Sequence, residues 1–293
     1  MSWTEELEKM ENRATVNKII PFSNVDGPGN RLAIFFQGCN IHCVYCHNPE
    51  TINLCSKCKL CLPGCPTKAI KEDLNNIQFD NKLCVECDQC IKICKSNSSP
   101  RTKDYTVDEL LAIIEEYKLF IRGITVSGGE PTLKAPFITE LFKKVKSIGL
   151  TCFVDTNGFF DKEDISELIS VTDKFMVDIK AIDNLESLCD TKMSNNIDNL
   201  KYLLSLDKVY EVRTVLIEEL MDLDNTVDTV ANIVKEFPEV IYKLIRVHTE
   251  GLREEQKEKI KDKIPSQARM KEVEQRVEAI GVKKVEIIDF PSV

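Results

Sequence analysis

Apolar runs of strand length alternate along most of this chain with segments whose apolar residues recur at helical spacing. The expected strands span residues 31–37, 123–126, 150–154, 174–179, 209–216 and 240–247. The expected helices between them span residues 106–118, 136–148, 162–170, 197–206 and 224–237. Such alternation requires a parallel sheet with right-handed crossovers, so the pattern predicts an α/β fold of six strand-helix steps.

The two ends of the chain lie outside this alternation. Residues up to about 17 are expected to form a short charged helix or a loose arm. After the last step we expect helices 254–263 and 266–280 and a final strand, 285–288. The N-terminus lacks a basic region followed by an apolar core, so no secretory signal is expected. The sequence also has no apolar run near the ~20 residues that span a bilayer.

Cysteine content and charge narrow the class of protein. A cytoplasmic location is expected, and in that reducing compartment thirteen cysteines are better explained by metal than by disulfides. Eleven of them fall between Cys39 and Cys94. The net charge of −9 argues against a nucleic-acid partner, which would usually face a basic stripe.

The first cysteine group directly follows the first of the six strands. Cys39, Cys43 and Cys46 have a three-then-two spacing. Cubane iron-sulfur clusters are bound by Cys thiolates and normally take four of them, so three cysteines leave one iron open. An open site marks a reactive metal centre. Zinc with His42 or His47 as fourth ligand is the alternative, but zinc sites usually consist of two well-separated ligand pairs.

The remaining cysteines of this region form an internal repeat. Cys55, Cys58, Cys61 and Cys65 recur, offset by 29 residues, as Cys84, Cys87, Cys90 and Cys94. Both runs have the spacing of bacterial two-cluster ferredoxins, in which the fourth Cys of each run ligates the other cluster. One cluster is therefore assigned to Cys55, Cys58, Cys61 and Cys94, and the other to Cys84, Cys87, Cys90 and Cys65. Two four-cysteine zinc knuckles, the alternative, would not need the third Cys of each run.

Polar and glycine-rich segments follow or end several of the later strands. They are Ser-Gly-Gly-Glu-Pro at 127–131, Asp-Thr-Asn-Gly at 155–158, Asp178 with Lys180, Arg213 and His248. In a parallel α/β barrel the strand ends share one catalytic rim, so we expect these side chains to lie together. Each segment alone is more often a plain turn or a capping residue. Their expected convergence on one rim indicates a functional site.

Two combinations of motifs resemble known families. The first three cysteines with Gly-Gly-Glu-Pro at 128–131 resemble the radical S-adenosylmethionine (SAM) superfamily, whose fold is a partial (β/α)6 barrel. Asp-Gly-Pro-Gly-x-Arg at 26–31 with Asp-Thr-Asn-Gly at 155–158 resembles the glycyl-radical-enzyme activating enzymes, over nearly the whole chain. The eight-cysteine insert is similar to that of activators other than those of pyruvate formate-lyase. Residues 21–29 are most similar to the YjjW-like branch.

The resemblance implies a reaction. SAM would be chelated by the open iron and reductively cleaved to methionine and a 5'-deoxyadenosyl radical, which abstracts hydrogen from a backbone glycine of a partner enzyme. Gly128 and Gly129 would let the backbone approach SAM closely, and Glu130 would pair with its ammonium group.

Further site residues also rest on the resemblance. A monovalent-cation site is matched by Asp155, Thr156, Met176 and Asp178. Positions near the cosubstrate or the incoming glycine loop are matched by Lys180, Arg213 and His248. The channel for the partner peptide is matched by Asp26, Gly27, Pro28 and Gly29. The implied cofactors are three 4Fe-4S clusters and SAM, with a monovalent cation as a further candidate. The implied partners are a glycyl radical enzyme and a flavodoxin or ferredoxin reductant.

The expected organisation has three segments. Residues 1–49 hold the arm, the first strand and the radical SAM cluster loop, residues 50–99 a ferredoxin-like insert with two clusters, and residues 100–293 the rest of the barrel. The insert could relay electrons, dock the partner or stabilise itself, and we favour relay. A radical SAM enzyme acting on a small molecule and a ferredoxin-like electron carrier are the alternatives. Cys152 is expected to be a small apolar strand residue and Cys189 an ordinary free thiol.

Overall fold

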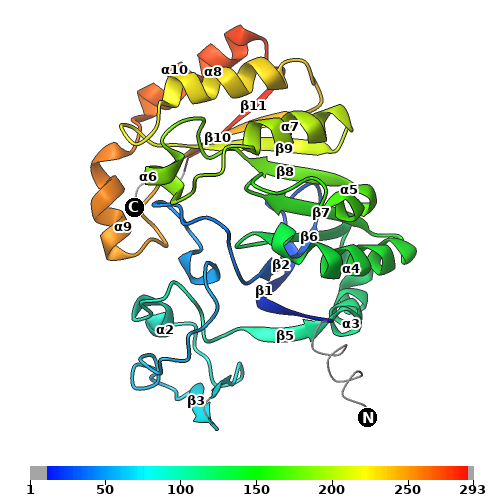
Figure 1. The fold of residues 1–293 in the computed structure, drawn as a ribbon, viewed down its shortest axis with the longest axis vertical. Coiled ribbons are helices and arrows are strands. Elements are labelled where there is room, and N and C mark those ends of the chain that lie inside the picture. Colours follow the sequence, from blue (N-terminus) through cyan, green and yellow to red (C-terminus); the bar gives the residue numbers. More distant parts are fainter. Residues whose placement is uncertain (1–11, 75, 290–293) are drawn as a thin grey trace. The chain divides into compact units, whose positions relative to one another are not determined.

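The computed structural model describes residues 12–74 and 76–289 (Figure 1). The chain forms two compact units. The first comprises the described residues up to Asn40 and from Asn48 to Leu150, and the second Ile41–His47 and the described residues from Thr151 onward. The three-segment organisation expected from the sequence divides the chain by function and stays a prediction.

The sheet of the first unit joins one parallel strand pair to antiparallel neighbours. Its strands, in spatial order, are β6 (Gly123–Gly128), β2 (Arg31–Phe36), β1 (Arg13–Ser23) and β5 (Lys103–Thr106). β2 pairs with β6 in parallel, from Arg31 opposite Gly123 to Phe36 opposite Gly128. β1 runs antiparallel to both β2 and β5. The carboxyl ends of β2 and β6 therefore lie side by side.

The expected N-terminal helix or arm was wrong over its described part. Residues from Arg13 onward form strand β1. Ala14 and Val16 are buried between more exposed neighbours, so the side chains alternate as in a half-buried strand. Pairing on both sides decides this conformation, and that information is not local. Residues 1–11 of the expectation lie outside the described residues.

The helices of the first unit follow the expected pattern closely. They are α3 (Val107–Tyr117) and α4 (Ala135–Ser147), with the short η1 (Pro49–Thr51), η2 (Lys118–Phe120) and η3 (Pro131–Lys134). Thr106 caps α3 as predicted: its hydroxyl accepts from the Glu109 backbone N-H, and the Glu109 carboxylate accepts from the Thr106 N-H. Leu110 and Ile114 are fully buried on the apolar face of α3.

The cysteine-rich insert of the first unit has short elements. A hairpin of β3 (Ile70–Asp73) and β4 (Asn76–Phe79) joins the two cysteine runs, and α2 (Gln89–Lys92) lies inside the second run. Its small buried cluster consists of Cys61, Ile70 and Cys90. Partly buried side chains, among them Leu62, Ile77 and Phe79, pack against this cluster.

The second unit is a parallel α/β layer. Its strands, in spatial order, are β11 (Lys284–Ile288), β10 (Ile241–Arg246), β9 (Val209–Leu216), β8 (Lys174–Asp178) and β7 (Thr151–Thr156), each parallel to its neighbours. Its helices are α5 (Ser166–Val171), α6 (Leu185–Cys189), α7 (Asn196–Ser205), α8 (Leu223–Val234), α9 (Glu254–Ile260), η4 (Lys261–Lys263) and α10 (Gln267–Ile280). The α/β fold predicted from the alternation is confirmed.

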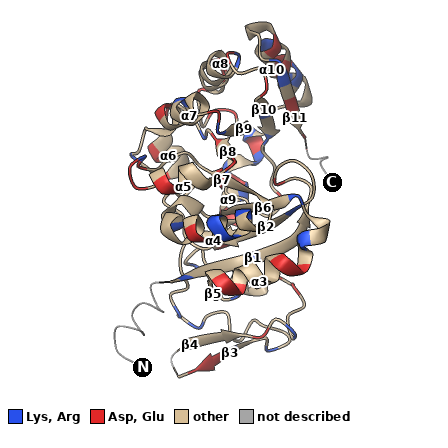
Figure 2. Ribbon diagram, turned by 90° about the vertical axis from the view of Figure 1, so that its right-hand side faces the viewer, with Lys and Arg blue, Asp and Glu red and all other residues tan. Residues whose placement is uncertain are grey.

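Residues of both charges occur along the helices of the second unit, coloured blue and red on the ribbon of Figure 2. Arg269 of α10 pairs with Asp224 of α8, with a nitrogen-oxygen distance of 2.6 Å. Such a pair is typical of a solvated helix surface. Across the described ranges, we find no helix that combines the length and the apolar character needed to cross a bilayer.

Candidate active site

Cys39 lies at the end of β2, where backbone hydrogen bonds fix its position. Its N-H donates to the Ile52 carbonyl at 2.9 Å, and the Gly38 N-H donates to the Thr51 carbonyl at 2.8 Å. The buried Gln37 amide donates to the Asn53 carbonyl at 2.6 Å. The chain that leaves the three-cysteine motif is thus tied back to the strand that precedes it.

Close packing against the end of β2 explains the two glycines at the end of β6. A Cβ on Gly128 would lie 2.3 Å from the Phe36 carbonyl oxygen, and one on Gly129 would lie 2.1 Å from the Gly38 carbonyl oxygen. Gly128 also has φ +117°, which favours glycine. The pair is therefore required for the Cys39 loop to approach β6. Its predicted contact with SAM stays a prediction.

Glu130 is buried directly after these glycines. Its N-H donates to the Gly38 carbonyl at 2.7 Å. Its carboxylate accepts from the Thr132 N-H at 3.0 Å and the Thr132 hydroxyl at 2.6 Å, which starts η3. Glu130 thus holds the β6 loop against the Cys39 loop, and its predicted pairing with an ammonium group stays a prediction.

Cys43 and Cys46 belong to the second unit, where their loop pairs with the end of α6. The His42 N-H donates to the Cys189 carbonyl at 2.8 Å, and the Val44 N-H donates to the Leu188 carbonyl at 2.9 Å. The Sγ atoms of Cys43 and Cys189 are 3.4 Å apart. That hydrogen bond, followed by burial, raises the pKa of the Cys43 thiol well above its usual value.

Cys189 is a free thiol, as expected, but its contact with Cys43 was not predicted. Cys189 is fully buried against Cys43, from which it is separated by 146 positions in sequence. No local pattern could have revealed a contact that only the fold creates. Cys152 agrees with its expectation, being fully buried in strand β7.

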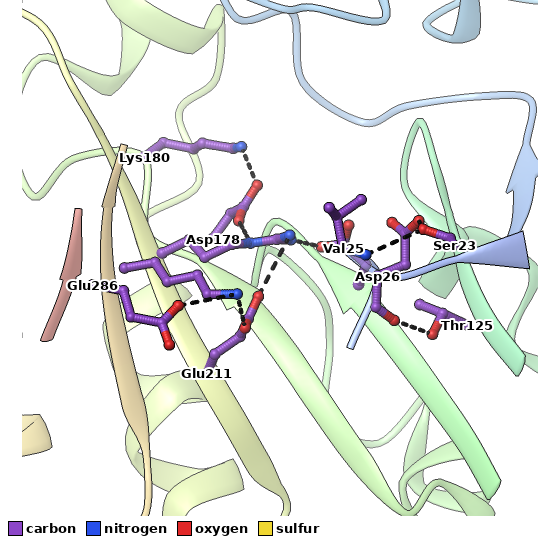
Figure 3. Close-up of polar contacts among 11 residues, drawn as sticks. Ser23, Val25, Asp26, Thr125, Asp178, Lys180, Glu211 and Glu286 are labelled. Carbon is purple, nitrogen blue, oxygen red and sulfur yellow. Dashed lines mark hydrogen bonds and ion pairs between the residues drawn. The ribbon is translucent and has the colours of Figure 1, made fainter. Parts of the chain in front are cut away.

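Three neighbouring strands bring four of the predicted residues together around Arg213 (Figure 3). The register places Asp178 of β8 opposite Arg213 of β9, and Asp155 of β7 lies one strand further. The Arg213 guanidinium donates to Asp178 at 2.6 Å and also pairs with Asp155. Lys180 pairs with the other Asp178 oxygen at 2.7 Å. The strand ends therefore form one cluster of alternating charge.

Lys180 supplies a fixed positive charge in this cluster. Burial lowers the pKa of Lys180, but Asp178 and the nearby Tyr45 outweigh it and hold that pKa well above the usual value. Tyr45 is itself buried, and its pKa is raised first by burial and then by Cys43. Tyr45 was not predicted from the sequence, because an aromatic residue between two cysteines carries no signal by itself.

Thr156 and Met176 are also buried at these strand ends. The Thr156 hydroxyl accepts from the Gly158 N-H at 3.2 Å, and Met176 is fully buried in β8 between Asp155 and Glu211 on the neighbouring strands. With Asp155 and Asp178 already paired to Arg213, the proposed monovalent cation stays a prediction.

Glu211 is a further charged residue that the sequence did not reveal. It is fully buried on β9, and one carboxylate oxygen lies 2.6 Å from the Lys243 ammonium on β10 (Figure 3). Burial raises the pKa of Glu211 above its usual value, and Lys243 opposes that shift. In a mostly apolar strand, the sequence pattern predicts that a single glutamate faces solvent.

His248 stacks on His47 after the end of β10. The ring centroids are 4.0 Å apart with an interplanar angle of 24°, and His47 Nε2 lies 3.1 Å from the His248 carbonyl oxygen. Burial first, and then His248, lower the pKa of His47 to about 4. His47 is therefore neutral near pH 7, and the pair joins the predicted His248 to the residue next to Cys46.

The turn at Asp26 is anchored on β6 in the first unit (Figure 3). The Asp26 carboxylate accepts from the Ser23 hydroxyl, and its carbonyl accepts from the Thr125 hydroxyl at 2.6 Å. Arg31, which is almost fully buried, donates to Thr125 Oγ1 at 2.8 Å. Gly27 and Gly29 both have positive φ, as the predicted turn requires.

The insert brings one predicted cysteine quartet together. A small hollow is lined by residues that include Cys55, Cys58, Cys61, Cys90 and Cys94. Four of these are the quartet assigned to one ferredoxin-type cluster. Within the described ranges no three such side chains close around a single metal ion. The assignment of this quartet to an iron-sulfur cluster stays a prediction.

Comparison with known proteins agrees with this geometry. The Radical SAM superfamily model matches residues 33–222. A Haemophilus influenzae protein described as a candidate glycyl-radical enzyme activating enzyme is 35% identical, over 82% of this chain and 84% of its own length. The isethionate sulfite-lyase activating enzyme of Oleidesulfovibrio alaskensis is 31% identical, over 78% and 82%. The crystal structure of QueE from Escherichia coli shares the fold with a TM-score of 0.50, at 13% identity and 95% coverage of both chains.

These matches extend over the strands, the three-cysteine loop and the polar strand ends described above. The chain belongs to the radical SAM superfamily and, within it, to the glycyl-radical enzyme activating enzymes. It is therefore an enzyme that uses a 4Fe-4S cluster and SAM, and its partner is a glycyl radical enzyme. The expected activity and the α/β fold of the radical SAM enzymes are confirmed, and the ferredoxin-like nature of the insert stays a prediction.

Proposed function

We propose that this activating enzyme works with three 4Fe-4S clusters. Cys39, Cys43 and Cys46 would hold the radical cluster, and the two quartets of the insert would hold the others. The donor chemistry fits, because each assigned group consists of thiolates. The cysteine-lined hollow of the insert is the observation that supports this proposal most directly.

The residues around Arg213 would position SAM. When bound, the radical cluster and SAM supply a 5'-deoxyadenosyl radical, which takes a hydrogen atom from a backbone glycine of the partner. Lys180 carries a fixed positive charge beside Cys43 and would attract the SAM carboxylate. Arg213 holds Asp155 and Asp178 in place and neutralises their charge. The stacked His47 and His248 would exclude water from the same region.

Electron relay is the proposed role of the insert. The backbone of Cys39 is bonded to Ile52, and the next residue, Asn53, is bonded to the segment after Cys94. The Asn53 N-H donates to the Asn97 carbonyl at 2.9 Å, and the Asn53 amide donates to the Ser96 carbonyl at 3.0 Å. These contacts support a short path between the insert and the radical cluster loop. A flavodoxin or ferredoxin would deliver the electrons.

The turn at residues 26–29 would guide the glycine-bearing peptide. Its carboxylate and carbonyl are fixed by Ser23 and Thr125, so the turn presents a rigid edge rather than a mobile loop. Extended peptides are recognised best by surfaces that are ordered before binding. The partner's glycine loop, a protein segment, is therefore the favoured substrate over a small molecule.

Anaerobic reconstitution tests the proposal. We expect roughly twelve irons per chain, the sum of three four-iron clusters, and 5'-deoxyadenosine formation on reduction with SAM. Cys43→Ala should abolish cleavage and leave about eight irons. Replacing Cys58 and Cys87 together should leave the radical cluster but slow cleavage with flavodoxin as reductant and not with dithionite. Unchanged cleavage with flavodoxin would refute the relay, and zinc in place of iron would refute the clusters.

A further inference from the structure

The two halves of the insert carry equivalent ion pairs of opposite polarity. In the first half Lys59 pairs with Glu72, and in the second Asp88 pairs with Arg101. The offset of 29 residues that relates the cysteines relates Lys59 to Asp88 and Glu72 to Arg101 as well. The same place in the two copies therefore holds a carboxylate in one and a guanidinium in the other.

Arg101 contacts a predicted cluster ligand. Its Nε donates to Cys90 Sγ at 3.4 Å, while its terminal nitrogen pairs with Asp88. The Arg101 side chain is only 16% exposed, and the Arg101 N-H donates to the Ser99 hydroxyl at 3.1 Å. The guanidinium thus donates to the Cys90 sulfur and also pairs with the Asp88 carboxylate. Cys90 itself is buried, so water screens this contact little.

We infer that Arg101 raises the reduction potential of the cluster bound by Cys84, Cys87, Cys90 and Cys65, and that the two clusters of the insert therefore differ in potential. The inference rests on the three-cluster proposal above. Reduction adds negative charge to a cluster, so a cation and an N-H donor at a ligand sulfur stabilise the reduced state. Arg101 acts through Cys90 and is a positioning residue rather than a catalytic one.

Other hydrogen-bond donors to the sulfurs of this quartet also favour a higher reduction potential. In this quartet Cys65 Sγ accepts from the Ala69 N-H at 3.2 Å, and Cys84 Sγ accepts from the Glu86 N-H at 3.4 Å. In the other quartet Cys94 Sγ lies 3.3 Å from the Ser98 hydroxyl, which is neutral. Arg101 adds a cation bonded to a sulfur of the quartet to which Cys90 is assigned.

The cluster with the higher reduction potential is the one further from Cys39 along the path of hydrogen bonds through Ile52 and Asn53. Cys55, in the other quartet, is three residues from Ile52, a chain reach of at most about 11 Å. Cys94 of that quartet precedes the segment bonded to Asn53. The Cys55 quartet is therefore the inner cluster and the Cys90 quartet the outer one. The outer cluster is reduced first and stores an electron until the inner one passes one on.

Reductive titration of the reconstituted full chain, followed by electron paramagnetic resonance, tests the inference. Cys58→Ala and Cys87→Ala remove the inner and outer signals respectively and so assign them. Arg101→Gln should shift the outer midpoint to a more negative value and leave the inner one in place. Arg101→Lys, which keeps the charge, should shift it less. Glu72→Gln, the equivalent position in the other copy, is the matched control and should not move the outer midpoint.

Asp88→Asn provides a second variant with the opposite sign. Removing this carboxylate leaves the charge of Arg101 uncompensated, so the outer midpoint should become less negative. Unmoved outer midpoints in iron-replete Arg101→Gln or in Asp88→Asn would overturn the role of Arg101. A wild-type chain with only about four irons, or without the two assignable signals, would instead refute the three-cluster proposal.

Discussion

Arg213 is the residue on which the charge cluster of the second unit depends. It bridges carboxylates from the two preceding strands, Asp155 and Asp178, and the three side chains are only 14–24% exposed. Planar guanidinium groups suit this role because they bind two carboxylates at once. Lys180 and Glu211 extend the cluster on either side. Removing any charged member therefore changes the balance of charge in the cluster.

Arg213→Gln should destabilise the protein and abolish SAM cleavage. The substitution removes the guanidinium that pairs with Asp155 and Asp178 and leaves Lys180 beside Asp178, so the free energy of unfolding should fall by about 3 kcal/mol. Urea denaturation and the 5'-deoxyadenosine assay measure both effects. Arg269→Gln is the control, because it breaks a similar pair with Asp224 on α8 and α10 and should leave cleavage intact. Normal cleavage by Arg213→Gln would contradict a role at the site.

Glu211 should make stability depend on pH. Burial raises the pKa of its folded-state carboxyl above the usual 4.5, so the folded protein holds this proton to higher pH than the unfolded chain. Its contribution is complete below about pH 4.5 and is lost as pH rises through the raised value. The stability of wild type relative to Glu211→Gln should therefore fall as pH rises above about 4.5 in urea titrations. A difference in stability between wild type and Glu211→Gln that stays constant with pH would contradict this prediction.

At the scale of elements, some features follow from the local sequence pattern, and others are created by tertiary contacts. The strands, the Thr106 cap and the cysteine repeat were predictable, because each depends on residues within one element or one motif. The strand ends that carry Asp155, Asp178 and Arg213 were predictable for the same reason. Strand β1, the Cys189 contact and the buried Glu211 were not, because each is created by a partner distant in sequence.

Gly129→Ala should displace the loop that begins at Cys39. The new Cβ would lie 2.1 Å from the Gly38 carbonyl oxygen and 2.9 Å from the Thr51 carbonyl oxygen, and neither is a flexible side chain. Bound iron should fall by about one four-iron cluster, and SAM cleavage should be lost. Gly149→Ala is the control: it has φ +86° with nothing within 4 Å of the new Cβ, so it should cost about 1 kcal/mol and keep its iron. Full iron content in Gly129→Ala would show that the loop adapts.

At the scale of the whole molecule, the two kinds of structure have different sources of stability. The strands of both units bury long apolar side chains, whereas the insert has a small buried cluster and exposes Leu60, Val85 and Ile93. Metal binding often supplies the folding free energy of such small segments. The clusters are therefore expected to be structural for the insert as well as redox-active.

Iron removal should unfold the insert before the rest of the chain. With the clusters chelated, limited proteolysis should cut first between residues 55 and 94, while the strands stay protected. Mass spectrometry of the early fragments locates the cuts. The reconstituted protein is the control and should resist cleavage in this range. Early cuts spread evenly over the chain would show that the clusters stabilise the whole protein instead.

The reversed ion pairs of the insert also bear on how a duplicated sequence folds faithfully. Two similar copies joined in one chain are prone to exchange equivalent segments, so that the hairpin of one docks on the cysteine run of the other. Here an exchange would set Lys59 against Arg101 and Asp88 against Glu72, two repulsive contacts in place of two attractive ones. The reversed polarity therefore disfavours the exchanged pairing and favours pairing of each segment within its own copy. We expect this preference to bring the cysteines close to their predicted quartets before iron is bound.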